Sequence, residues 1–119
     1  SNGGLVLTGL LESGFLEKKK LTVSKLVIIG SPYQFNQEMY DDFQTRKHRL
    51  EKEVEVLNFV GSFSGTSDGI VPLSSAQAAQ SIFEKQAYTE VNLKGRKAHH
   101  SALPTNPDLV KQLSLFLNL

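Results

Sequence analysis

The chain has 119 residues, which suits one domain of ordinary size or part of a larger one. Thirteen Lys and Arg against twelve Asp and Glu leave a formal net charge of +1, which argues against a dedicated nucleic-acid binder. Hydrophobic residues at 39% and charged residues at 21% predict a packed core, and the lack of cysteine excludes disulfides, thiolate metal sites and a cysteine nucleophile. No apolar run approaches the roughly 18–20 residues that a membrane-spanning helix needs.

The N-terminal segment starts on Ser1 without a methionine, so we expect the chain to be cut from a longer protein. Beyond two glycines its apolar residues have a loosely helical spacing, and Gly14 near its end suits a helix C-cap. The residues that form the apolar face are Leu5, Leu7, Leu10, Leu11 and Phe15.

Three apolar segments predict strands. Residues 26–29 and 54–60 are short continuous runs rich in β-branched residues, which is typical of strands covered on both faces in a parallel sheet. Residues 87–93 form a weaker segment, in which Val91 and Leu93 alternate with polar neighbours, and predict an edge strand.

Helices are predicted between and after these strands. Ser74 or Ser75 can cap one that extends to Phe83, and Asn106 followed by Pro107 marks the start of a C-terminal helix. Alternating helices and strands indicate the α/β class, with a parallel sheet and crossover helices.

The segment of about 31–52 is a polar insert that also carries aromatic residues. It has two interpretations: a helix-bearing cap over a site, or a surface excursion with its own small apolar contact. Its large apolar residues are Tyr33, Phe35, Met39, Tyr40 and Phe43.

Serine, aspartate and histidine, residue types that can act in catalysis, occur in segments expected at the carboxyl ends of strands. Open α/β sheets place their sites at these ends. Ser1 stands before two glycines that allow the sharp turn of a nucleophile elbow, although a serine at a helix start is most often a cap. Asp68 lies in the glycine- and serine-rich segment 61–72, where Asp-Gly is also a turn signal. His99 and His100 follow the third strand, and a lone loop histidine is usually a surface residue.

The order serine, aspartate, histidine, each after a strand, is the triad order of α/β-hydrolases. A serine hydroxyl is a poor nucleophile until a base takes its proton, and histidine titrates near neutrality, so it can take that proton and return it to the leaving group. The aspartate fixes the histidine tautomer and stabilises the imidazolium.

Four segments resemble this family. Residues 1–5, Ser-Asn-Gly-Gly-Leu, resemble the core of the elbow, and residues 67–72, Ser-Asp-Gly-Ile-Val-Pro, resemble the acid loop. Residues 100–107, His-Ser-Ala-Leu-Pro-Thr-Asn-Pro, resemble the histidine loop of the lipase-like, cell-surface α/β-hydrolases of Gram-positive bacteria. Residues 30–33, Gly-Ser-Pro-Tyr, resemble the end of strand six in those proteins.

The resemblance implies that residues 1–119 are the C-terminal half of one α/β-hydrolase domain, a three-layer sandwich with a mostly parallel sheet and a lid-like insert at about 31–52. It implies a carboxylic-ester hydrolase of the esterase or lipase type that forms an acyl-enzyme, exported or at the cell surface. Ser1 would be the nucleophile, Asp68 the acid and His100 the base. The backbone N–H of Asn2 would be one oxyanion donor.

By composition and position, the insert residues Tyr33 and Phe35 are candidates for contact with an apolar or lipid-like ester substrate. No cofactor and no metal are expected, because the three histidines (His48, His99 and His100) lack a recognised ligand spacing. We expect the chain to pair with the missing N-terminal half or with another copy, because three strands would expose a long apolar sheet edge.

Two other functions stay open. In the first, Ser1 is an N-terminal nucleophile that uses its own α-amine as the base, although such enzymes have layered antiparallel sheets. The second alternative is a non-catalytic or truncated hydrolase fragment that binds a partner through its exposed edge.

Overall fold

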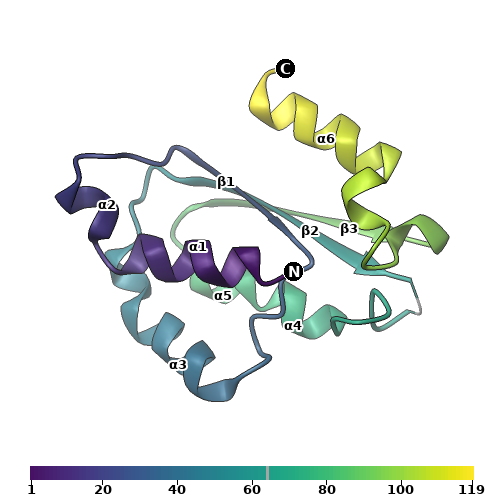
Figure 1. Cartoon of the computed structure of the whole chain (residues 1–119), viewed down its shortest axis with the longest axis horizontal. Coiled ribbons are helices and arrows are strands. Elements are labelled where there is room, and N and C mark those ends of the chain that lie inside the picture. The colour runs from purple at the N-terminus through teal and green to yellow at the C-terminus, as the bar shows by residue number, and fades with distance from the viewer. Residues whose placement is uncertain (64) are drawn as a thin grey trace.

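Three parallel strands form the centre of the computed structural model, which describes residues 1–63 and 65–119. The strands are β1 (Lys25–Ile29), β2 (Glu55–Ser62) and β3 (Ala87–Lys94), in the order β1-β2-β3 (Figure 1). β2 pairs in parallel with β1 on one side and with β3 on the other. The three predicted strands and the parallel sheet are confirmed, and β3 lies at an edge as its alternating pattern predicted.

Helices precede, connect and follow these strands. Before β1 come α1 (Gly3–Glu12) and α2 (Phe15–Lys18), and between β1 and β2 come α3 (Gln37–Arg46) and the 3₁₀ turn η1 (Lys47–Arg49). Between β2 and β3 come α4 (Leu73–Gln77) and α5 (Ala79–Ile82), and after β3 come η2 (Arg96–Ala98), η3 (Leu103–Thr105) and α6 (Pro107–Leu117). None of the described helices is long and apolar enough to cross a membrane.

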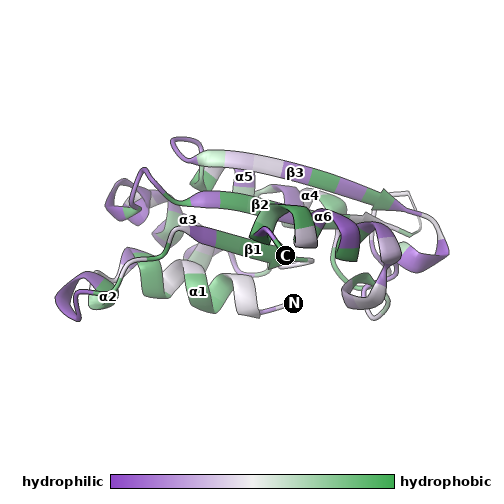
Figure 2. Cartoon of the chain, turned by 90° about the horizontal axis from the view of Figure 1, so that it is seen from above, coloured by the Kyte–Doolittle hydropathy of each residue, from purple (hydrophilic) through white to green (hydrophobic). Residues whose placement is uncertain are grey.

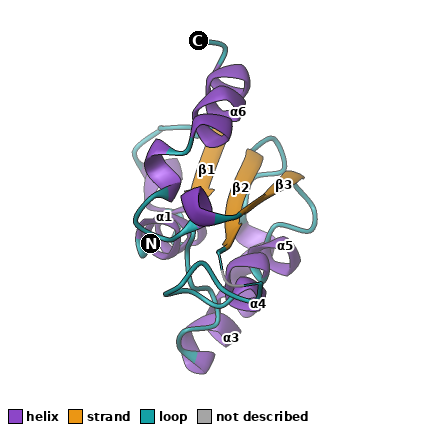
Figure 3. Ribbon diagram, turned by 90° about the vertical axis from the view of Figure 1, so that its right-hand side faces the viewer, coloured by secondary structure: helices purple, strands orange, loops and turns teal. Residues whose placement is uncertain are grey.

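The two faces of the sheet are covered by different helices, which gives the three layers. Successive strand residues point to opposite faces. Leu26, Ile28 and Val56 therefore join a core with α1, α3 and α5, whereas Leu57 and Phe59 join a second core with α6. Figures 1 and 3 show α6 on one side of the sheet and α3, α4 and α5 on the other.

Hydrophobic residues are concentrated in β1 and β2, while β3 is mixed (Figure 2). This follows from position, since β2 is paired on both sides and covered on both faces. β3 has one buried residue, Leu93, and is otherwise half-buried or exposed.

Local capping signals are confirmed at two helix ends and wrong at a third. Gly14 adopts a left-handed conformation (φ +76°) just after α1, and the Asn106 side chain accepts from the N–H groups of Asp108 and Leu109 at the start of α6. Neither Ser74 nor Ser75 caps a helix, because α4 already starts at Leu73 and ends before α5. The Ser75 hydroxyl accepts instead from the N–H of Gln34, 2.9 Å away.

The insert of about 31–52 contributes to the core as well as to the surface. Phe43 and Leu50 are both 6% exposed and pack in the core that covers β1. Phe35, by contrast, is 80% exposed. The insert therefore packs on the core through Phe43 and Leu50, while most of its residues from 34 to 49 are exposed or half-buried.

Candidate active site

Asp68 and His100 form a hydrogen-bonded pair beyond the carboxyl ends of the strands. His100 Nδ1 lies 2.7 Å from Asp68 Oδ2, and the Asp68 side chain is 2% exposed against 16% for the His100 side chain. A carboxylate only accepts hydrogen bonds, so a hydrogen belongs on Nδ1, and in the neutral imidazole Nε2 is then the nitrogen with a free lone pair. The pair can thus present a neutral imidazole as a proton acceptor.

The acid loop holds the second oxygen of Asp68 through its own backbone. Oδ1 accepts from the N–H groups of Ile70, at 2.9 Å, and Val71, at 2.6 Å. The Asp68 N–H donates to the carbonyl of Val71, and Gly69 takes a positive φ of 98° at the tip of the turn. The Asp-Gly turn predicted from the sequence is therefore present, and this turn fixes the carboxylate of Asp68.

Three loops converge on this pair. The His100 N–H donates to the Asp68 carbonyl at 2.7 Å, which ties the loop after β3 to the loop after β2. Gly30, directly after β1, approaches both side chains: a Cβ there would lie 3.2 Å from Asp68 Oδ2 and 3.2 Å from His100 Nδ1. Gly30 also has a positive φ of 56°, so this position favours glycine for two reasons.

Ser1 lies at the same edge of the sheet. Its main-chain nitrogen donates to the carbonyl of Ile29, the last residue of β1, at 3.2 Å, and the residue is exposed. Among residues 1–63 and 65–119, no hydrogen bond joins the Ser1 hydroxyl to His100. The structure therefore places Ser1 beside the strand whose next residue touches the pair, without joining the three side chains.

The two glycines after Ser1 have different surroundings. A Cβ on Gly4 would overlap Ser31 Oγ and lie 2.9 Å from a methyl group of Ile28, so only glycine lets α1 pack this closely on the end of β1. A Cβ on Gly3 would meet nothing within 4 Å. Asn2 precedes α1, and because the first N–H groups of a helix lack intrahelical partners, its backbone N–H stays outside the helical ladder.

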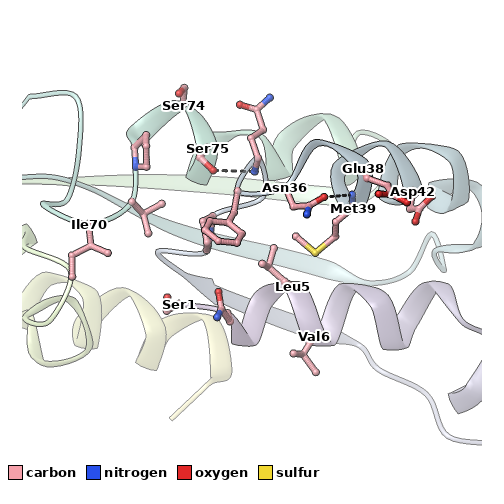
Figure 4. A pocket seen from close by; sticks show the side chains of 16 residues that line it. Ser1, Leu5, Val6, Asn36, Glu38, Met39, Asp42, Ile70, Ser74 and Ser75 are labelled. Carbon is pink, nitrogen blue, oxygen red and sulfur yellow. Dashed lines mark hydrogen bonds between the residues drawn. The ribbon is translucent and has the colours of Figure 1, made fainter.

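A cavity of about 990 Å³ opens beside Ser1 (Figure 4). Its walls come from the start of α1, the insert, the acid loop and α4. The apolar lining residues are Leu5, Val6, Pro32, Phe35, Met39, Ile70, Val71 and Pro72. The cavity thus joins Ser1 and Asn2 to the two residues whose N–H groups hold Asp68, while Asp68 and His100 do not line it.

The two aromatic residues predicted to contact substrate, Phe35 and Tyr33, lie in different environments. Phe35 lines the cavity and is exposed. Tyr33, the other candidate, is fully buried and does not line the cavity. Its ring packs on Phe43 with centroids 5.9 Å apart, because this part of the insert supplies the core over β1.

The His99 side chain contacts Ser101, Phe63 and Gly69. Its Nδ1 lies 3.1 Å from Ser101 Oγ, and its ring meets the Phe63 ring edge-on with centroids 5.0 Å apart. It also covers Gly69, where a Cβ would lie 2.7 Å from the His99 ring. Of the two adjacent histidines, His100 is the one bonded to Asp68. Within the described residues, no cluster of three or more histidine or acidic side chains could hold a metal ion.

Residues 1–118 match the model of a family described as α/β-hydrolases of unknown function (DUF915). The chain belongs to this α/β-hydrolase family. No curated protein matches it. The family assignment confirms the α/β-hydrolase resemblance drawn from the loop motifs.

Two crystal structures are similar to this α/β-hydrolase chain over 98% of its length. One is the product of the gene lin2722 from Listeria innocua, with a TM-score of 0.85, 31% identity and 55% of that chain covered. The other, from Lactobacillus plantarum, is named provisionally as a cell surface hydrolase, with a TM-score of 0.82, 30% identity and 50% covered. The α/β-hydrolase chain therefore spans about half the length of these solved structures.

The sequence patterns missed the residues that bring the loops together. Gly30 and Ser31 appear only within the segment 30–33 that resembles the end of strand six, which says nothing of their contacts, and Thr8 gives no signal. Thr8 and Ser31 are nevertheless almost fully buried. A glycine directly after a buried strand is the one local hint, because such a position often marks close backbone approach.

Proposed function

We propose that the complete protein is a serine hydrolase of the esterase or lipase type that cleaves carboxylic esters through Ser1, Asp68 and His100. The main support is the 2.7 Å bond between His100 Nδ1 and Asp68 Oδ2, at the sheet edge where Ser1 also lies. A histidine that a carboxylate orients makes a serine hydroxyl nucleophilic when it takes the hydroxyl proton, and Ser1 precedes a helix at the same sheet edge.

In the proposed reaction, Ser1 Oγ attacks the ester carbonyl carbon while its proton passes to His100 Nε2. His100 then gives that proton to the departing alcohol oxygen, which leaves an acyl-enzyme. Water attacks the acyl carbon, His100 takes the water's proton and returns it to Ser1 Oγ, and the carboxylic acid leaves. Asp68 stays ionised throughout and stabilises the imidazolium.

The developing oxyanion needs hydrogen-bond donors. We assign one to the backbone N–H of Asn2, which directly follows the nucleophile and lines the cavity with it. In α/β-hydrolases the second donor comes from a loop after an early strand, so we place it in the remainder of the domain. Loss of one donor typically costs about 10²–10³ in rate.

The cavity beside Ser1 is the proposed acyl site. Its apolar walls, with Phe35 and Met39 from the insert and Ile70 from the acid loop, suit an aliphatic or lipid-like chain. A volume of about 990 Å³ leaves room for a chain of many carbons.

We further propose that the rest of the hydrolase domain pairs with β1. Within the described residues β1 has a strand partner only in β2, and the similar solved structures are about twice as long as this chain. An unpaired strand edge is a route to association. In size-exclusion chromatography with light scattering, the 119-residue chain by itself should therefore form oligomers, and it should form a complex when its missing half is present. A monodisperse monomer would contradict this.

For location, we propose that the protein is exported. The support is the description of the Lactobacillus plantarum relative as a cell surface hydrolase. Antibody labelling of intact cells and of a cytoplasmic fraction tests this, and signal confined to the cytoplasmic fraction would overturn it.

A fluorophosphonate probe tests the chemistry in the complete protein. We expect labelling of Ser1 that is lost in Ser1→Ala and His100→Ala but kept in His48→Ala, a matched control at η1 away from the strand ends. Labelling that survives His100→Ala and needs a free α-amine would favour the N-terminal nucleophile mechanism, against which the parallel sheet already counts. No labelling of the folded protein would favour the non-catalytic association module.

A further inference from the structure

We propose that the buried hydroxyl groups of Thr8, Ser31 and Tyr33 position Ser1 by clamping the first turn of α1. This inference deepens the proposed function and rests on it. The three side chains are 0%, 1% and 0% exposed, and each of them forms a hydrogen bond with the backbone of one residue, Gly4.

Gly4 is held on both its backbone polar groups. Its N–H donates to Ser31 Oγ at 3.2 Å. Its carbonyl accepts from Thr8 Oγ1 at 2.6 Å and from the Tyr33 hydroxyl at 3.2 Å. By accepting this bond, Ser31 satisfies an N–H group at the start of α1, where the first N–H groups of a helix have no partner within the helix.

The number of hydroxyl hydrogens determines which group is the donor in each of these bonds. Each hydroxyl has one hydrogen to donate. Thr8 donates to the Gly4 carbonyl, and Tyr33 lies 2.9 Å from Thr8 Oγ1, so Tyr33 donates to Thr8 with the Gly4 carbonyl as a longer second acceptor. Burial raises the pKa of the Tyr33 phenol well above its ordinary value, which keeps its hydrogen in place at any physiological pH.

The loop that carries the clamp also touches the acid–base pair. Ser31 and Tyr33 follow Gly30, whose Cα region lies against Asp68 and His100. The Tyr33 N–H donates to the carbonyl of Ser75 at 3.2 Å, which anchors the same loop on α4. One short loop therefore contacts the turn that follows Ser1 and the pair that must accept its proton.

This arrangement explains why fully buried polar groups stand at this point of the core. Buried hydroxyls cost free energy unless they are bonded, so apolar side chains would serve packing alone at least as well. A fixed distance between a nucleophile and its base does need such a support, since a displacement of about 1 Å can cost on the order of 10² in rate.

The test compares isosteric variants in the complete protein. Thr8→Val and Tyr33→Phe each remove one hydroxyl and keep the shape, whereas Thr8→Ser keeps the hydroxyl. Tyr40→Phe removes a hydroxyl from the same insert, but the Tyr40 hydroxyl is bonded to Ser81 and not to α1. Ile82→Val, in the same core, controls for lost stability alone. The readouts are the rate of Ser1 labelling by fluorophosphonate, kcat and KM for a chromogenic ester, and Tm.

We expect Thr8→Val and Tyr33→Phe to lower the labelling rate and kcat by about tenfold or more, with KM within twofold of wild type and Tm above the assay temperature. Thr8→Ser should restore most of the rate, and Tyr40→Phe and Ile82→Val should stay near wild type. If Thr8→Val unfolds, Tyr33→Phe decides the question by the same criteria.

Two outcomes overturn the inference in distinguishable ways. Variants that melt earlier but react at the wild-type rate show that the hydroxyls serve stability only. A wild-type protein that is neither labelled nor active removes the proposed function itself, and with it the nucleophile that the clamp would position.

Discussion

His100 Nδ1 lies 2.7 Å from Asp68 Oδ2, while the other oxygen of that carboxylate accepts two backbone N–H groups of its own loop. Both oxygens are thus occupied, and the carboxylate cannot rotate without breaking bonds to Ile70 and Val71. Those two residues also line the cavity beside Ser1. The acid is therefore fixed by the same turn that forms part of the proposed acyl site.

Asp68→Asn should lower kcat by about 10⁴ with little loss of fold, because an amide can donate to Nδ1 and so favours the wrong histidine tautomer. Steady-state hydrolysis of a chromogenic ester by the complete protein measures this, with circular dichroism as the control for folding. A kcat within tenfold of wild type would show that Asp68 does not orient the base.

Gly30→Ala should reduce activity much more than stability. The new Cβ would meet Asp68 Oδ2 and His100 Nδ1 at 3.2 Å, at a backbone φ of 56° that costs about 1–2 kcal/mol for a residue with a side chain. Gly14→Ala is the matched control, since Gly14 has a similar φ of 76° and nothing within 4 Å of a Cβ. Equal losses of kcat in both variants would mean that only backbone strain matters.

Phe35→Ser should change the preference for acyl-chain length without unfolding the protein. Phe35 is 80% exposed and lines the cavity, so its loss removes apolar contact with a long chain and little from the core. The ratio of kcat/KM for long and short esters measures the effect, which we expect to be about tenfold for a lost aromatic wall. An unchanged ratio would place the acyl chain elsewhere.

Phe43→Ser should destabilise the fold instead. Phe43 is 6% exposed and packs on Tyr33 in the core over β1, and removal of a buried phenylalanine side chain costs about 3–5 kcal/mol. Urea unfolding followed by circular dichroism measures the change. A loss below about 1 kcal/mol would contradict the core position of this residue.

Glu12 should make stability depend on pH near neutrality. It is 2% exposed on α1, and among the described residues its Oε2 has no hydrogen-bond partner. Burial raises its pKa from 4.5 to about 7, with Asp42 adding to the rise and Arg46 and Arg49 opposing it. Because the pKa of Glu12 is higher in the folded than in the unfolded protein, protonation of Glu12 stabilises the fold. This contribution to the free energy of unfolding is complete below pH 4.5 and is lost as the pH rises to about 7.

The matched variant is Glu12→Gln, which stays neutral at every pH. Its free energy of unfolding relative to wild type should rise by at most about 3 kcal/mol between pH 4.5 and 7. This limit follows from the shift in the pKa of Glu12, because one pKa unit corresponds to about 1.36 kcal/mol. Urea titrations of both proteins across this range measure the difference. Parallel stability curves would show that Glu12 keeps an ordinary pKa in the folded protein.

Local sequence patterns are enough to specify the strands, the parallel sheet and the order of the candidate residues. The continuous apolar runs at 26–29 and 54–60 predict these strands, because a strand that is buried on both faces needs apolar residues at successive positions. The Asp68 turn and the Asn106 cap are equally local, since each depends on bonds to residues two or three positions away.

Which residues meet in space depends on tertiary packing. Aromatic residues of the insert look alike in sequence, yet Tyr33 lies in the core and Phe35 at the cavity, because their surroundings come from α1, α3 and the sheet. His100 rather than His99 bonds Asp68 for the same reason: the choice depends on how the loops after β2 and β3 pack. Hydrogen bonds between residues 25 or more positions apart, such as Tyr33 to Thr8, leave no periodic trace in a sequence.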